Sequence, residues 1–76
     1  MDLVPDDDVR SFLERLAADP RVGRIMVRLT DGTHLTGTIG PIGNRAVILK
    51  ALGGRAFYDA YVRFEAVATI EVQTRA

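Results

Sequence analysis

Two alternating runs of residues meet at Asp31-Gly32, and this junction constrains the fold more than any other feature of the chain. Residues 24–30 alternate between apolar and polar side chains, which is the pattern of an antiparallel strand with one buried face. Residues 33–39 alternate in the same way after the junction. Because Asp-Gly between two such runs favours a tight turn, the sequence predicts a β-hairpin here.

Three more strands are expected after this hairpin. Gly37 marks a bend or a close backbone approach in the second strand, and residues 40–44 predict a turn by composition. Residues 45–52 are apolar on both faces, which is typical of an interior strand. Residues 55–63 have high β-propensity, and residues 67–72 form the fifth strand. In this last strand the side chains expected to face the core are Ala68, Ile70 and Val72.

An amphipathic helix is predicted over residues 6–18, before the strands. Its apolar residues recur at helical spacing and are Val9, Phe12, Leu13 and Leu16. One of the three acids at residues 6–8 is expected to cap the helix, and the others favour its positive end. A metal site at these acids is the weaker interpretation, because no other hard ligands lie nearby. Asp19-Pro20 ends the helix.

One helix followed by five short strands indicates a mainly β fold with one N-terminal α-helix, in the form of a small, strongly bent barrel. Residues 1–76 are interpreted as one domain, with the helix at 6–18, the barrel at 23–72 and a polar tail at 73–76. A domain this small buries only about 60% of its unfolded surface, and the chain has no cysteine for disulfides. These properties raise the expectation of self-association.

Charge is distributed unevenly along the chain, although the net charge is zero. Residues 1–20 carry six acids and two bases, whereas residues 21–76 carry eight bases and four acids. The excess in the second part could attract phosphate groups. However, a sequence pI near 6.5 lacks the strongly basic footprint of an obvious nucleic-acid binder.

Catalytic chemistry is not expected. The chain has one histidine, one serine and no cysteine, and nothing in the sequence brings Ser11 to His34 for a Ser-His-Asp arrangement. No cofactor is predicted.

The acidic start of the chain does not resemble a secretory signal, and the longest aliphatic run is too short to cross a bilayer. The chain is therefore interpreted as a binding or assembly protein with a cytoplasmic location and no membrane partner.

Several strings resemble the Sm-like family, and within it the Hfq group of bacterial RNA chaperones. The similar strings cover roughly residues 9–72 and are Phe12-Leu13, Asp31-Gly32, Leu35-x-Gly37-x-Ile39, Val47-Ile48-Leu49 and Ala66-Val67-Ala68-Thr69-Ile70. The resemblance implies an Sm-like/SH3-like barrel that forms a homo-oligomeric ring, a hexamer or thereabouts. The fourth strand of each subunit would pair with the fifth strand of its neighbour, which also removes the open edges of the sheet.

The positions that contact bases in this family differ here. Ala46 stands where the family has an aromatic residue that stacks on uracil, and Arg63-Phe64-Glu65 stands where it has Tyr-Lys-His. On the opposite face, the positions of the adenine-binding residues hold Arg28, Thr33 and Thr36. The sequence thus keeps framework positions of the family and replaces those that bind bases.

Four residues are candidates for a substitute RNA site: Arg45, Arg63, Phe64 and Arg28. Phosphate pairing together with one stacking ring is the minimum for binding a single-stranded nucleic acid. The alternative interpretation is that Arg45 is a solvated loop charge, Arg63 pairs with an acid such as Glu65 or Asp59, and Phe64 packs in a turn.

Five residues are candidates for the subunit interface: Phe57, Tyr58, Tyr61, Val67 and Thr69. The aromatic residues among them could equally be ordinary barrel core. The first functional hypothesis is a ring that binds RNA, or another single-stranded nucleic acid, without catalysis. The alternative is a ring-forming structural or adaptor protein that binds protein partners and not RNA.

Overall fold

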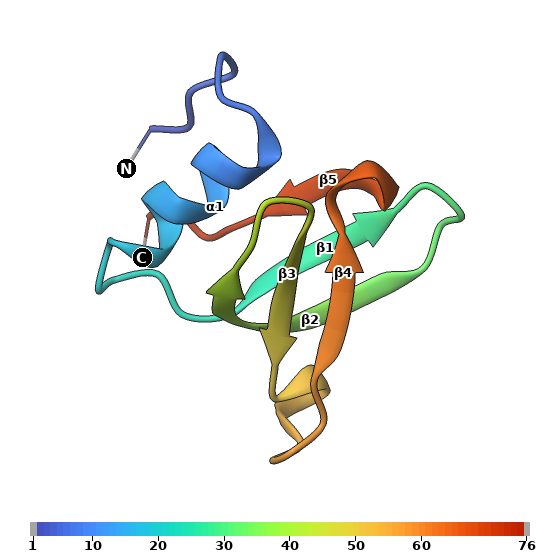
Figure 1. The fold of residues 1–76 in the computed structure, drawn as a ribbon. Helices are drawn as coiled ribbons and strands as arrows, with labels where there is room; N and C mark the ends of the chain where they lie inside the picture. The colour runs from blue at the N-terminus through green and yellow to red at the C-terminus, as the bar shows by residue number, and fades with distance from the viewer. Residues whose placement is uncertain (1, 76) are drawn as a thin grey trace.

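The computed structural model of the protein describes residues 2–75 (Figure 1). The elements within this range are α1 (Val9–Ala17), β1 (Ile25–Leu29), β2 (His34–Ile42), β3 (Ala46–Lys50), the 3-10 helix η1 (Leu52–Gly54), β4 (Ala60–Arg63), the 3-10 helix η2 (Phe64–Ala66) and β5 (Val67–Glu71). The strands form one antiparallel sheet in the order β4-β3-β2-β1-β5. This confirms the predicted fold class, a mainly β domain with one N-terminal helix and a five-stranded, strongly bent sheet.

The helix α1 begins at Val9, three residues later than predicted. Asp8 is its N-cap, and one carboxylate oxygen accepts a hydrogen bond from the backbone N–H of Ser11 at 2.8 Å. The capping prediction is therefore confirmed, while the preceding acids lie before the helix. One of them, Asp7, forms an ion pair of 2.7 Å with Arg15 instead of extending the first turn.

The hairpin at Asp31-Gly32 joins β1 to β2 as predicted, with Arg28 opposite His34 in the register. Gly32 has a φ of +90°, which glycine adopts without steric cost. The carboxylate of Asp31 accepts a hydrogen bond from the N–H of Thr33 at 2.9 Å. The turn chemistry and the alternating pattern therefore specify the same register.

The strand β2 bends because it belongs to both halves of the sheet, pairing with β1 along its first part and with β3 along its second. A Cβ atom on Gly37 would lie 2.5 Å from the carbonyl oxygen of Lys50, so the predicted close backbone approach is confirmed. The prediction of a turn at residues 40–44 is wrong at its start, because β2 continues to Ile42. A register shift between Ile39 and Ile42 accommodates the proline between them.

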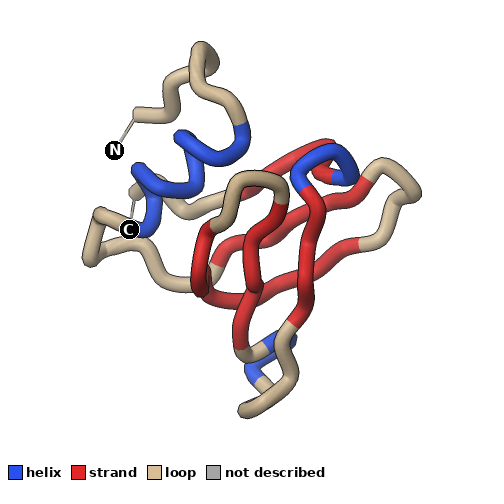
Figure 2. The backbone as a smooth tube through the Cα atoms, in the orientation of Figure 1, coloured by secondary structure: helices blue, strands red, loops and turns tan. Residues whose placement is uncertain are grey.

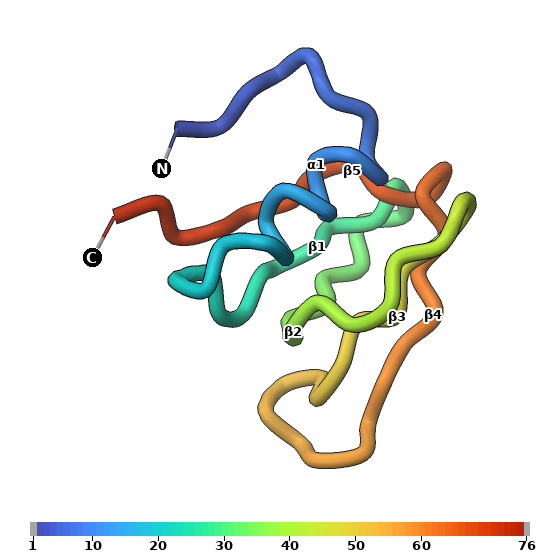
Figure 3. Tube along the Cα trace, turned by 60° about the vertical axis from the view of Figure 1, so that its left-hand side comes forward, coloured from blue at the N-terminus to red at the C-terminus, as the bar shows by residue number. Residues whose placement is uncertain are grey.

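The fourth strand is shorter than the predicted 55–63 and covers only Ala60–Arg63. The residues before it form a loop, residues 51–59, which contains η1. Four of its residues have positive φ values, namely Ala51, Gly53, Gly54 and Phe57. Such a backbone cannot continue a strand, whatever the β-propensity of its side chains. Figure 3 shows this loop at the bottom of the view, away from α1 at the top.

The fifth strand has a register shift against β1, where Arg28 is opposite Thr69 and Leu29 is opposite Val67. This irregularity turns Ala68 outward, so the prediction that Ala68 faces the core is wrong. Ile70 and Val72 do pack against the core, as predicted.

The core is formed by side chains of α1 and of the sheet, and Figure 2 shows α1 lying beside the strands. The fully buried members of the core come from α1 and from the three strands β1, β3 and β4, and they are Leu13, Leu16, Ile25, Val27, Val47, Leu49 and Val62. No helix within residues 2–75 is long and apolar enough to cross a membrane. Residues 73–75 follow β5 without regular structure, and Ala76, the last residue of the predicted tail, lies outside the described residues.

Candidate functional site

Pairing between β3 and β4 brings three of the four predicted RNA-binding residues together. Ala46 is opposite Arg63 in the register, which sets Arg45 and Phe64 next to each other just beyond the pair. The backbone N–H of Phe64 donates a hydrogen bond to the carbonyl oxygen of Arg45 at 2.8 Å. The turn before β3 and the end of β4 therefore form one continuous surface.

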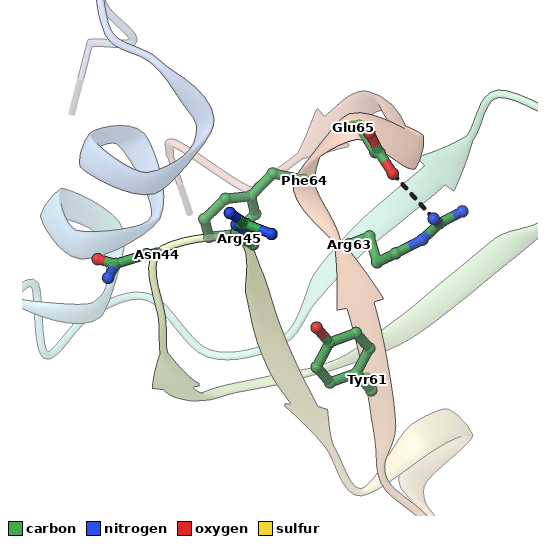
Figure 4. A pocket seen from close by; sticks show the side chains of 6 residues that line it. All are labelled: Asn44, Arg45, Tyr61, Arg63, Phe64 and Glu65. Atoms are coloured by element: carbon green, nitrogen blue, oxygen red, sulfur yellow. Dashed lines mark hydrogen bonds and ion pairs between the residues drawn. The ribbon is translucent and has the colours of Figure 1, made fainter.

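A pocket of about 550 Å³ opens on this surface. It is lined by Asn44, Arg45, Tyr61, Arg63, Phe64 and Glu65 (Figure 4), and it is called the Arg45–Arg63 pocket below. Its two cations, one carboxylate and two aromatic rings suit a ligand that carries both negative charge and a flat apolar face.

The two arginines of the pocket differ in their electrostatic state. Arg63 donates from Nη1 to Oε1 of Glu65 at 2.8 Å, and both side chains are largely exposed. Arg45 is exposed and has no ion-pair partner among residues 2–75. Figure 4 shows Arg63 pointing toward Glu65 and away from Arg45. Arg45 is therefore the free cation of the pocket, whereas the charge of Arg63 is balanced by a neighbour.

The aromatic residues of the pocket are also unequal. Phe64 is half-buried and packs against the hydrophobic core, so its position is fixed by packing. Tyr61 lies on the edge strand β4 and is 68% exposed. It also lines a second pocket of about 320 Å³, whose apolar lining includes Pro41, Ile42 and Ile48. Tyr61 thus connects the Arg45–Arg63 pocket to an apolar surface on β2 and β3.

Arg28, the fourth candidate, lies elsewhere. It is an exposed residue of β1, between His34 on β2 and Thr69 on β5 in the register. It does not line the Arg45–Arg63 pocket. Arg28 would belong to a separate contact if it binds nucleic acid.

The five candidate interface residues fall on three parts of the molecule. Tyr61 is on β4 and the pair Val67 and Thr69 is on β5, which are the two edge strands. Thr69 is exposed, whereas Val67 is half-buried and packs on the core. Phe57 and Tyr58 are in the loop 51–59, outside any strand, and both are exposed.

One pocket residue was not identified from the sequence. Asn44 lines the pocket, and its side-chain oxygen accepts a hydrogen bond from Nη1 of Arg10 on α1. This contact links the helix to the turn that carries Arg45. No local sequence signal reveals it, because the two residues are separated by the whole β1-β2 hairpin.

Metal binding is not suggested by the described residues, since no group of three histidine, aspartate or glutamate side chains among residues 2–75 could hold an ion.

No protein-family model matches the chain, and no curated protein matches it significantly.

Proposed function

We propose that this protein assembles into a closed homo-oligomeric ring and binds RNA, or another single-stranded nucleic acid, without catalysing a reaction. The observation that carries the binding proposal is that Arg45, Arg63 and Phe64 line one pocket. Arginines pair with phosphate oxygens and an aromatic ring stacks on a base, which are the two interactions that single strands require. A cytoplasmic location is part of the same proposal.

The two edge strands support the ring. No strand within the described residues pairs with the outer edge of β4 or of β5. Neither strand contains proline or lysine, which proteins commonly use to protect a sheet edge. Pairing β4 of one subunit with β5 of the next satisfies both edges, and repetition of that contact around an axis closes a ring.

The position of the pocket links assembly to binding. Arg63 is the last residue of β4, and Phe64 begins the connection to β5. A neighbouring subunit that pairs with β4 would therefore lie beside the Arg45–Arg63 pocket. Each ring would present one pocket per subunit, so weak sites could act together on a single strand by avidity.

The resemblance to the Sm-like family supports the same proposal. The strings that carry it supply the hairpin turn, the Gly37 bend, the buried centre of β3 and the start of β5. The replaced base-contacting positions imply a binding mode that differs from the family's, with arginine charge in place of lysine and histidine.

A fluorescence titration tests this function. Labelled U-rich, A-rich and mixed RNAs are titrated at two salt concentrations, with the wild type, Arg45→Gln and the control Arg75→Gln. We expect binding that weakens with salt, and a weaker affinity with a smaller salt slope for Arg45→Gln. Arg75 lies beyond β5 and outside the pocket, so its variant should bind like the wild type. No binding at micromolar protein in low salt contradicts the proposal.

The second candidate function is a ring that binds protein partners. Two observations favour it: Glu65 neutralises Arg63, and Tyr61 joins an apolar pocket with Pro41 and Ile48. Such a surface suits an apolar side chain of a partner. Affinity capture from a nuclease-treated lysate separates the two functions, because RNA-dependent partners should disappear and direct protein partners should remain.

A further inference from the structure

The loop 51–59 presents an aromatic side chain that has no packing role. Phe57 is 99% exposed, although its backbone has a φ of +67°. The left-handed region is unfavourable for a bulky residue, and glycine or asparagine would fit it better. An exposed ring held in a strained conformation points to a role outside the folding of this domain.

Hydrogen bonds close the loop and hold its shape. The backbone N–H of Leu52 donates to the carbonyl oxygen of Tyr58 at 2.7 Å. The N–H of Ala51 donates to a carboxylate oxygen of Asp59 at 3.1 Å. The N–H of Gly54 donates to the carbonyl oxygen of Ala51 at 2.9 Å. Phe57 is thus carried on a preorganised loop, which lowers the entropic cost of using it in binding.

Three cations lie in this loop or next to it. The guanidinium of Arg55 lies over the ring of Tyr58, with 4.1 Å between Cζ and the ring centre. The guanidinium of Arg24 lies against Gly54, where an added Cβ atom would collide with it. Lys50 immediately precedes the loop.

None of these three cations has an ion-pair partner among residues 2–75. Asp59 is the acid of the loop, and one of its carboxylate oxygens already accepts the N–H of Ala51. The surface therefore carries a local positive charge that is not balanced within the domain, next to an exposed ring.

We propose that the loop 51–59, together with Arg24 and Lys50, is a second contact surface for single-stranded nucleic acid. Phe57 stacks on an unpaired base, while Arg24, Lys50 and Arg55 pair with the flanking phosphates. None of these residues lines the Arg45–Arg63 pocket, so this surface does not depend on that pocket. The ligand, single-stranded nucleic acid, is the same as in the proposed function. The residues that support this second surface are different from those of the pocket.

A lipid surface is less well matched to the same residues. Interfacial binding requires a larger apolar area than one exposed phenylalanine beside a tyrosine. Leu52, the aliphatic residue of η1, packs against the core instead of extending that area. Charge complementarity to phosphate and a single ring of base-stacking size therefore favour nucleic acid.

The variant Phe57→Trp gives a direct test, because the chain has no tryptophan of its own. Its emission should be quenched when a mixed-sequence single-stranded RNA of 12 nucleotides is added, since stacking brings the indole against a base. Inorganic polyphosphate, which has charge but no bases, should not quench it. Emission that stays unchanged at saturating RNA overturns the proposal.

The variant Phe57→Gly tests the contribution of the ring without threatening the fold, because glycine relieves the left-handed conformation. We expect its affinity for the labelled RNA to fall by about fivefold or more, with unchanged affinity for polyphosphate. Arg55→Gln should weaken binding of both. The matched control Leu3→Gly removes another exposed apolar side chain and should leave RNA binding unchanged.

The two surfaces can fail separately. If Arg45→Gln weakens RNA binding and Phe57→Gly does not, the loop proposal is wrong and the pocket stands. If only Phe57→Gly weakens binding, the loop proposal stands and the pocket does not bind RNA.

A separate experiment measures binding of the protein to vesicles of phosphatidylserine. Phe57-dependent binding to these vesicles, without Phe57-dependent binding to RNA, overturns the proposal in favour of a membrane contact.

Discussion

Nη1 of Arg63 lies 2.8 Å from Oε1 of Glu65, in a contact that occupies one of the two cations of the Arg45–Arg63 pocket. The side chains are 62% and 75% exposed, so the ion pair contributes little to stability, within about 1 kcal/mol. The ion pair matters for the proposed binding, because the carboxylate of Glu65 neutralises the charge of Arg63. A phosphate that approaches Arg63 must compete with a carboxylate that is already in place.

Glu65→Gln should therefore raise the affinity for single-stranded RNA. Removing the carboxylate releases Arg63 and increases the positive charge of the pocket by one unit. We expect binding to tighten by about two- to fivefold, with a steeper dependence on salt. Fluorescence anisotropy at two salt concentrations measures both effects.

Asp6→Asn is the matched control for that experiment. It makes the same charge change before α1, at an exposed aspartate that forms no ion pair among residues 2–75 and lies outside the pocket. An equal gain in affinity in both variants would indicate a general effect of net charge and would argue against a specific role of the Arg63–Glu65 contact.

Gly37→Ala should destabilise the domain, because the new Cβ atom meets the backbone carbonyl of Lys50 at 2.5 Å and the sheet must shift to admit it. The expected loss is about 1–3 kcal/mol in the free energy of unfolding. Urea denaturation at one fixed protein concentration measures it, since self-association would add to apparent stability.

Gly23→Ala provides the comparison for Gly37, because a Cβ atom there has nothing within 4 Å. We expect this variant to be neutral or to gain up to about 1 kcal/mol from a less flexible unfolded chain. Equal destabilisation by the two substitutions would contradict the close approach of β2 to β3.

Much of this fold can be predicted from short-range patterns. The Asp31-Gly32 turn, the alternation in β1 and the Asp8 cap each involve residues near one another in sequence, and the structure contains all three. The prediction of strand at residues 55–59, within the loop 51–59, is wrong because it depends on the β-propensity of the aromatic side chains alone. The left-handed backbone at Ala51 and Phe57 depends on contacts that close the loop, such as Leu52 with Tyr58.

The candidate site can be predicted from the sequence only in part. The meeting of Arg45 with Phe64 follows from the antiparallel pairing of β3 with β4, two strands that are consecutive in the chain. The contribution of Asn44 and its contact with Arg10 does not follow, since it depends on how α1 lies over the sheet. The separation of Arg28 from the pocket likewise depends on the three-dimensional arrangement of β1 relative to β4.

The Asp19 carboxylate should titrate well below the ordinary range. The side chain of Arg21 donates hydrogen bonds to it at 2.9 and 3.0 Å, and the backbone N–H of Arg21 donates another. These bonds lower the pKa of Asp19 to about 2. NMR titration of the carboxyl carbon measures this value, and Arg21→Gln should raise it toward about 3.9, the ordinary value for aspartate.

Stability should fall in acid as a result of this shift. A carboxylate whose folded pKa is depressed stabilises the fold above its unfolded pKa of about 3.9, and this contribution is lost as the pH falls toward about 2. Thermal unfolding of Asp19→Asn should therefore depend less on pH in that window than unfolding of the wild type. Identical pH dependence of the two proteins would show that Asp19 is not a source of acid sensitivity.

Tyr61→Glu should weaken assembly of the proposed ring. Tyr61 is exposed on the edge strand β4, and a neighbouring subunit that pairs with this edge would lie against its side chain. Burial of an unpaired carboxylate at such a contact is costly, so the expected fall in association is at least about tenfold. Sedimentation velocity over a range of concentrations should show the wild type as an oligomer and Tyr61→Glu shifted toward a monomer near 8.3 kDa.

Tyr61→Phe keeps the ring that a neighbour would contact, so it should assemble like the wild type. Phe57→Glu adds the same charge in the loop 51–59, which lies outside β4 and β5, and should also leave assembly intact. If Phe57→Glu dissociates the oligomer and Tyr61→Glu does not, the seam involves the loop and not the edge strand. A wild-type protein that sediments as a monomer at every concentration would exclude the ring. It would show that β4 of one subunit does not pair with β5 of another.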